Sequence, residues 1–267
     1  MQDIRVAAVV CRCPTGQVRR NLERAFHWTR LAKEKGADVI CFPELSISGY
    51  SLSPPDDTAQ SLHGPIATAV SQLADEQDIV VLAGMLEDRP GGRPCATQLV
   101  AVPGSTLGAY RKTHIAPPEK HLLAKGDQLP CFSVRGWTFA IQLCYDAHFP
   151  ELSTRMALKG AEVIFMPHAS PRGKPPGKAE SWLRHLPARA FDNGLFVVAC
   201  NQTGDNGQGL TFPGVAMVIG PDGRLIGQRR QDSEGVLLAD LKSADLKKVR
   251  THPMRFFLPH RRGDLYG

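Results

Sequence analysis

Four residues whose side chains could carry out hydrolysis each lie just beyond a run of strand-like residues. Glu44 follows an apolar run that stops at a proline, and Lys112 follows a second run that ends in Ala-Tyr-Arg. Glu119 lies in the loop after Lys112, and Cys144 ends the apolar run Trp-Thr-Phe-Ala-Ile-Gln-Leu. The carboxyl ends of strands are where α/β proteins assemble their active sites. The four positions therefore indicate a nucleophile, an acid–base pair and a cation in one site.

Cys144 is the strongest single signal. The segment after it, Tyr-Asp-Ala-His-Phe-Pro-Glu, is expected to open a helix. A thiol at such a turn faces the backbone N–H groups and positive end of the helix, which favour a thiolate and could hold an oxyanion. The alternative is a buried core cysteine, which is the interpretation given to the other thiols next to apolar runs, Cys41, Cys95, Cys131 and Cys200.

Strand and helix patterns alternate along the chain. Expected strands cover residues 4–10, 38–42, 79–84, 96–102, 105–110, 137–143, 163–166, 195–200, 215–219, 225–228 and 235–241. Expected helices cover residues 17–35, 66–77, 151–159, 179–193 and 243–249. Several strands are apolar throughout, so both of their faces must be covered by helices or by a second sheet. With neither an internal repeat nor a linker in view, residues 1–267 are expected to form a single domain.

Composition narrows the class of protein. The chain has 267 residues, of which 42% are hydrophobic and 22% charged, and this excludes a disordered chain. The net charge of +6 comes from scattered lysines and arginines without interleaved aromatic residues, so no nucleic-acid partner is expected. The N-terminal segment lacks the pattern of a signal peptide and no apolar run reaches the ~18 residues of a membrane span, so no membrane partner is expected.

The cysteines and histidines indicate neither disulfides nor a metal site. Seven cysteines without a framework spacing are typical of reduced thiols, which predicts a cytoplasmic protein. None of His114, His121, His148 and His168 pairs with another ligand at a zinc-binding spacing, so no metal and no cofactor are expected. His148 and His168 are instead candidates for the rim of a pocket, with a purely structural role left open.

Short blocks in a fixed order resemble the nitrilase, or carbon–nitrogen hydrolase, superfamily. They read FPEL at 42–45, YRKTH at 110–114, CYD at 144–146 and FPE at 149–151. Similar later blocks are GAE at 160–162, RA at 189–190, Asn193, and NQTG at 201–204. Each block alone is unspecific, but together they span about residues 4–240 with compatible gaps.

This resemblance implies an α/β fold, a four-layer α-β-β-α sandwich of two mixed β-sheets, and a catalytic triad of Glu44, Lys112 and Cys144 with Glu119 as a supporting carboxylate. A thiolate attacks a carbonyl carbon and also leaves again when water arrives. Glu44 would move the protons, while Lys112 and the Tyr145 backbone N–H would stabilise the oxyanion. Glu119 would orient Lys112 or the nitrogen of the substrate, unless it is simply a solvated loop carboxylate.

The expected function is hydrolysis of a non-peptide C–N bond in a small amide or N-carbamoyl compound, through a cysteine thioester and with release of ammonia. A true nitrilase is the nearest alternative, because the same triad attacks a nitrile carbon. Two other classes are a non-catalytic interaction protein on this fold and a redox-sensing thiol protein. The intact triad argues against the first. For the second, the nearest resolving cysteine in sequence, Cys131, is expected at the other edge of the sheet.

The sequence also suggests which side chains select the substrate and which segments form contacts between subunits. The candidates for substrate binding are Tyr50, Tyr145, His148, His168 and Arg172. The loop 170–178 carries three cations and no acid, so Arg172 either binds a substrate carboxylate or is solvated. The resemblance also implies a homo-oligomer in contact through the helix 151–159 and the tail 251–267, although the apolar side chains of this tail could instead pack on their own subunit.

Overall fold

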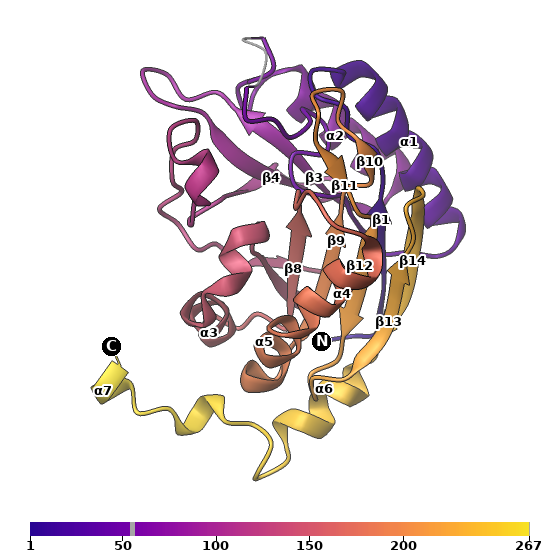
Figure 1. Cartoon of the computed structure of the whole chain (residues 1–267). Coiled ribbons are helices and arrows are strands. Elements are labelled where there is room, and N and C mark those ends of the chain that lie inside the picture. The colour runs from indigo at the N-terminus through magenta and orange to yellow at the C-terminus, as the bar shows by residue number, and fades with distance from the viewer. Residues whose placement is uncertain (54–56, 267) are drawn as a thin grey trace.

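Two six-stranded β-sheets lie face to face in the computed structural model, which describes residues 1–53 and 57–266 (Figure 1). Sheet 1 has the order β14-β1-β2-β3-β4-β5, with bounds Gly235–Leu241, Ile4–Val10, Val39–Cys41, Val80–Glu87, Cys95–Ala101 and Gly108–Arg111. Sheet 2 has the order β13-β12-β9-β8-β7-β6, with bounds Leu225–Arg230, Val215–Ile219, Phe196–Asn201, Val163–His168, Trp137–Ile141 and Phe132–Val134. A small ribbon pairs β10 (Gly204–Asp205) with β11 (Thr211–Phe212).

Both sheets are mixed in the same way. In sheet 1 the strands β1, β2 and β3 run parallel, and in sheet 2 the strands β7, β8 and β9 do so. Antiparallel strands flank each parallel centre. The parallel strands therefore deliver their following loops to one edge of each sheet, which is where ligand sites form in such sheets.

Helices cover the outer faces of the two sheets. On sheet 1 lie α1 (Val18–Glu34) and α2 (Pro65–Gln77), which contact each other. On the side of sheet 2 lie α3 (Pro150–Leu158), α4 (Pro175–Leu183) and α5 (Leu186–Asn193). The C-terminal part holds α6 (Ser243–Arg250) and α7 (Gly263–Tyr266), and short 3-10 turns are η1 (Pro117–Glu119), η2 (Cys144–His148) and η3 (Leu258–His260). Within the described residues no helix is both long and apolar enough to span a membrane.

The apolar strands are explained by burial on both of their faces. Along β1, Val6 and Val10 face the core between the sheets, whereas Ala7 and Val9 face α1 and α2. The buried positions of α1 include Ala25 and Ala32, spaced to form one stripe against sheet 1. The four-layer α-β-β-α sandwich expected from the sequence is therefore confirmed.

Two predicted elements are wrong in their extent. The helix predicted over 179–193 is two helices, because Pro187 lacks an N–H and its ring would clash with the carbonyl of Leu183 in a continuous helix. The strand predicted over 105–110 begins only at Gly108, after a turn in which Ser105 N–H donates to Val102 O. The break between α4 and α5 leaves His185 outside both helices.

The loop that carries Glu44 is held directly against β3. The N–H of Gly84 donates to Ser46 Oγ at 2.9 Å, and the N–H of Ile47 donates to Gly84 O at 2.8 Å. A Cβ atom on Gly84 would lie 2.2 Å from the backbone nitrogen of Leu45. Only a glycine allows this approach, so Gly84 helps to set the position of Glu44.

We therefore expect Gly84→Ala to push the Glu44 loop away from β3. Overpacking of this kind lowers the free energy of unfolding by about 1–3 kcal/mol, and the displaced carboxylate reduces turnover. Urea unfolding and steady-state kinetics measure the two effects. The matched control is Gly92→Ala, where the added Cβ meets only one atom, at 3.9 Å. If Gly84→Ala kept wild-type stability and turnover, Gly84 would not set the position of the Glu44 loop.

Candidate active site

The two catalytic carboxylates expected from the sequence share one buried cation. Lys112 Nζ lies 2.8 Å from Glu44 Oε1 and 2.9 Å from Glu119 Oε2. Lys112 is completely buried, and Glu44 and Glu119 are 1% and 4% exposed. Charges this deep must be paired and hydrogen-bonded, so the three groups form one unit, here called the buried charge cluster.

Further hydrogen bonds satisfy the outer oxygens of the cluster. Glu44 Oε2 accepts the backbone N–H of Ala169 at 3.0 Å, which ties the end of sheet 1 to the loop after β8. Glu119 Oε1 accepts the hydroxyl of Tyr50 at 3.0 Å. The Tyr50 hydroxyl is thus engaged with Glu119, and Glu119 in turn orients Lys112. Glu119 is a buried partner of the cation and not a solvated loop carboxylate.

Burial and charge pull the pKa values of the cluster in opposite directions. Burial by itself lowers the pKa of Lys112, but the negative charges of Glu44 and Glu119 outweigh it and raise that pKa well above its ordinary value. Burial raises the pKa of Glu44, and the negative charge of Glu119 adds to this, against the opposing effect of Lys112. Lys112 therefore stays cationic while Glu44 is a stronger base than an ordinary glutamate.

Cys144 lies directly after sheet 2 in a strained backbone conformation. Its φ of +46° falls in the left-handed region that residues with a Cβ rarely adopt, as in other nucleophile elbows. The sequence analysis expected the turn after Cys144 to favour a thiolate, whereas the surroundings of the free thiol favour its protonated form. Burial and the charge of Glu44 raise the pKa of the Cys144 thiol, and the opposing effects of Lys112 and of the Ala169 N–H do not offset them. Cys144 is therefore a thiol that needs a base.

Asp146 anchors the turn that carries Cys144, a role the sequence analysis did not assign. Its side chain is fully buried and accepts hydrogen bonds from five groups. These are Tyr110 Oη (2.8 Å), Thr113 Oγ1 (2.9 Å), His114 N (2.8 Å), His114 Nδ1 (2.9 Å) and Leu143 N (2.9 Å). Since most of these donors flank Lys112 in sequence, Asp146 links the Cys144 turn to the Lys112 strand. Asp146 is part of the block CYD that carried the family resemblance, but only the fold shows its hydrogen-bond partners.

Arg189 holds the same turn from the opposite side. Its guanidinium donates to Ala147 O at 3.0 Å and to His148 O at 3.2 Å. The turn is thereby clamped between α5 and β5, which keeps the sulfur in place although the backbone is strained.

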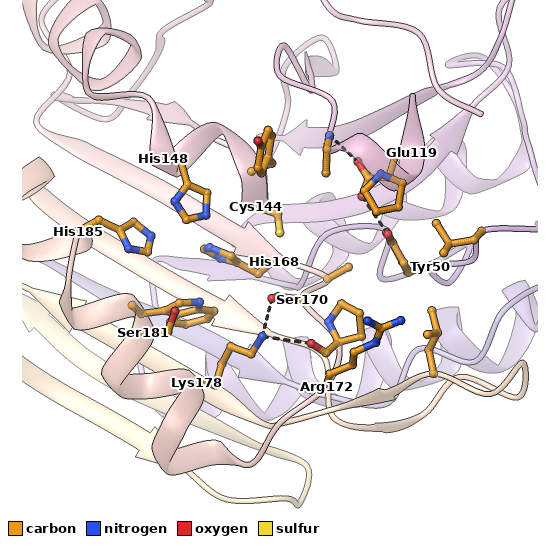
Figure 2. Close-up of a pocket in the computed structure, with 18 residues that line it drawn as sticks. Tyr50, Glu119, Cys144, His148, His168, Ser170, Arg172, Lys178, Ser181 and His185 are labelled. Carbon is orange, nitrogen blue, oxygen red and sulfur yellow. Dashed lines mark hydrogen bonds between the residues drawn. The ribbon is translucent and has the colours of Figure 1, made fainter. Parts of the chain in front are cut away.

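A cavity of about 350 Å³ opens beside Cys144, which is one of its lining residues (Figure 2). All five residues predicted to bind substrate line it, namely Tyr50, Tyr145, His148, His168 and Arg172. Lining residues that the sequence analysis missed include Lys178, Ser181, Trp182 and His185. These residues come from α4 and from the break before α5. Only the path of the folded chain brings them to the cavity, so the local sequence around them contains no signal of this role. Of the buried charge cluster, Glu119 is among the lining residues and Glu44 and Lys112 are not.

One side of the cavity is a cluster of uncharged imidazoles, visible on the left of Figure 2. The ring of His148 stacks on His185 at 4.6 Å, and the ring of His168 lies 4.2 Å from Trp182. Burial lowers the pKa of His168 to about 3 and that of His185 to about 4. His168 Nδ1 lies 2.7 Å from Met166 O, so this nitrogen carries the proton. These imidazoles are neutral at physiological pH.

The geometry gives little support to a redox-sensing thiol or to a metal site, the other kinds of chemistry considered from the sequence. All seven cysteines are free thiols, and the sulfur of Cys131 lies against Met156 O. In the part of the chain that the structure describes, no group of three or more His, Cys, Asp or Glu residues is arranged to hold a metal ion.

The fold and the site define a cysteine hydrolase on an α-β-β-α sandwich, and comparisons with known proteins identify the family. The family model described as carbon-nitrogen hydrolase matches residues 5–251. The chain belongs to this carbon–nitrogen hydrolase family, whose members act on carbon–nitrogen bonds other than peptide bonds, and it is a hydrolase of that kind.

Three relatives illustrate the similarity. The chain is 29% identical to the N-carbamoylputrescine amidase of Solanum lycopersicum, over 93% of this chain and 88% of the relative. It is 29% identical to the 2-oxoglutaramate amidase of Bacillus subtilis, over 88% of this chain and 89% of the relative. A mutant of the amidase from Nesterenkonia sp. AN1, with acrylamide added at its active-site cysteine, is 25% identical with a TM-score of 0.83, covering 98% of each chain.

The raised pKa of Glu44 predicts the acid limb of the pH profile. Glu44 must be ionised to accept the thiol proton, so kcat/KM should fall as pH drops through a midpoint above the usual glutamate value of about 4.3. Glu119→Gln removes a negative charge that disfavours ionised Glu44, and the midpoint should move to lower pH. Tyr50→Phe keeps both charges and should leave it in place. An upward shift in Glu119→Gln would contradict this reading of the cluster.

Proposed function

We propose that this protein hydrolyses a small amide or N-carbamoyl compound to an acid and ammonia, with Cys144 as nucleophile. The observation that carries the proposal is the buried charge cluster, in which Lys112 bridges Glu44 and Glu119, together with the cavity that Glu119 and Cys144 both line. The names of the three relatives, all amidases, support the same reaction class.

In the first half-reaction the thiol of Cys144 attacks the carbonyl carbon of the bound amide while Glu44 takes its proton. The resulting oxyanion is stabilised by the ammonium of Lys112 and the backbone N–H of Tyr145. One such donor contributes about 3–4 kcal/mol to the transition state. Glu44 then passes the proton to the nitrogen, the C–N bond breaks, and ammonia leaves behind a thioester on Cys144.

In the second half-reaction water attacks the thioester carbon. Glu44 accepts a proton from the water and returns it to the departing sulfur, which regenerates the thiol and releases the acid. The high pKa of Cys144 suits this cycle, because the resting enzyme keeps a protonated sulfur whose proton Glu44 must remove.

The proposal also covers the domain organisation of the protein and its location in the cell. Residues 1–267 act as one carbon–nitrogen hydrolase domain, since β14, from the last third of the chain, pairs with β1 as the edge strand of sheet 1. Seven free thiols support a reducing, cytoplasmic location, which cell fractionation tests.

Exposed apolar side chains on the C-terminal tail, residues 251–267, support a homo-oligomer. The last residue of this tail, Gly267, lies outside the described residues. Figure 1 shows the tail running from α6 along the lower edge of the molecule. Part of it packs on its own subunit, because the ring of Phe257 lies 5.5 Å from that of Phe191. Met254 and Leu265 nevertheless remain 76% and 64% exposed, and Leu158 on α3 is 48% exposed. A second subunit would cover these side chains.

Cys144→Ala should abolish ammonia release, because Cys144 is the one cysteine among the described residues that line the cavity. With a slowly hydrolysed amide, acid quenching of the wild type followed by intact-mass and peptide spectrometry should find one acyl group on Cys144. Cys131→Ala is the matched control and should retain full activity. Full activity of Cys144→Ala, or an acyl group on another cysteine, would sink the assignment of the nucleophile.

Light scattering at micromolar concentration should give a mass of at least two chains. Changing both Met254 and Leu265 to Asp places charges on the proposed contact and should shift the mass toward 29.1 kDa. A monomer mass for the unchanged protein would refute the oligomer.

A further inference from the structure

The cavity of the proposed amidase has an uneven distribution of charge. Glu119 is the one carboxylate among its described lining residues, and both of its oxygens already accept hydrogen bonds from Tyr50 and Lys112. Two cations also line the cavity, Lys178 and Arg172, and in the described part of the chain neither forms an ion pair with a carboxylate. Figure 2 shows both on the lower side of the cavity in this view, across from Cys144.

Lys178 is held in place with hydrogen-bonding capacity to spare. Its Nζ donates to Ser170 Oγ at 2.7 Å and to Pro171 O at 3.2 Å. An ammonium group has three N–H donors, so one remains for a ligand. The loop that supplies these acceptors is itself clamped, because Ser170 N–H donates to Asn201 Oδ1 at 2.9 Å and Asn201 Nδ2 donates back to Ser170 O at 3.1 Å. The charge is therefore preorganised.

Lys178 is half-buried on the face of α4 that forms the cavity wall. It lies one turn before Trp182, whose ring packs against His168, and both side chains line the cavity. Burial lowers the pKa of Lys178, which means that the cation is partly stripped of water. A charge in such a place gains more from an anionic ligand than an exposed lysine does.

The other walls do not favour a cationic ligand. The imidazoles of His168 and His185 are neutral, and Trp182 adds apolar surface next to them. Arg172 is exposed at the rim, on a backbone fixed by the hydrogen bond from its N–H to Thr211 O at 2.8 Å. Lys174, the third cation expected in this loop, is exposed at the start of α4 and does not line the cavity.

We infer that Lys178 selects amides that carry a carboxylate at the end remote from the scissile bond, with Arg172 as an auxiliary cation at the rim. This inference rests on the proposed amidase function and names its substrate class. The carboxylate would accept the free N–H of Lys178 while the amide carbon lies at Cys144. A substrate that ends in an ammonium group would instead place two cations together in a partly dehydrated space.

Three amides of matched length test this inference. Glutaramate ends in a carboxylate, pentanamide ends in a methyl group, and 5-aminopentanamide ends in an ammonium group. Ammonia release should give the highest kcat/KM for glutaramate and the lowest for 5-aminopentanamide. Lys178→Met should lower kcat/KM for glutaramate by on the order of ten- to a hundredfold, mainly through KM, and the loss for pentanamide should be at least tenfold smaller.

Charge reversal separates recognition from a purely structural role. Lys178→Glu should turn the order of preference around, so that 5-aminopentanamide becomes a better substrate than glutaramate, which a loosened loop would not produce. Lys178→Arg keeps the charge and should restore most of the preference for glutaramate. Lys174→Met, a matched loss of charge outside the cavity, should leave all three rates at wild-type values.

The outcomes distinguish the inference from the proposed function. If the wild type releases ammonia from pentanamide but shows no preference for glutaramate, or if Lys178→Met lowers all three rates equally, substrate selection by Lys178 is overturned and the amidase stands. If none of the three amides releases ammonia with the wild type, and none forms an acyl group on Cys144, the proposed amidase function itself fails for this substrate size.

Discussion

The active site depends on one buried cation shared by two carboxylates. Three charged groups without water cost several kcal/mol each in desolvation, and only short hydrogen bonds from several directions offset this. Here Lys112 supplies the central bonds, while Tyr50 and the Ala169 N–H satisfy the outer oxygens. Because the cluster loses its stability when one partner shifts, its surroundings must be rigid.

The fold supplies that rigidity by linking the two sheets. The cluster bonds across the interface, since Glu44 follows β2 in sheet 1 and accepts the N–H of Ala169 after β8 in sheet 2. The turn of Cys144 is clamped in the same manner, by Asp146 toward β5 and by Arg189 from α5. A strained nucleophile turn is maintained because hydrogen bonds from separate layers overdetermine it.

Charge is distributed across the site in two layers. The ionised cluster carries a net negative charge, since two carboxylates share one lysine, and burial together with this charge keeps the thiol protonated until a substrate is attacked. On the opposite wall Lys178 and Arg172 have no carboxylate partner among the described residues. The buried charge cluster is suited to moving protons and the wall across from Cys144 to holding an anion, so chemistry and selection use different elements.

The sequence by itself determined most of the strands, the placement of Glu44, Lys112 and Cys144 just beyond strands, and the family resemblance. Such features depend on local periodicity and on short ordered blocks, which a linear chain displays. Only the tertiary structure decided three further features: the protonated state of Cys144, the anchoring role of Asp146, and the presence of Lys178 and His185 in the cavity. Each of them depends on which distant groups surround a side chain and exclude water from it, and spacing along the chain carries no record of that. Pro187 illustrates the limit of sequence analysis. The proline is visible in the sequence, but only the fold shows that the helix break beside it forms part of the cavity wall.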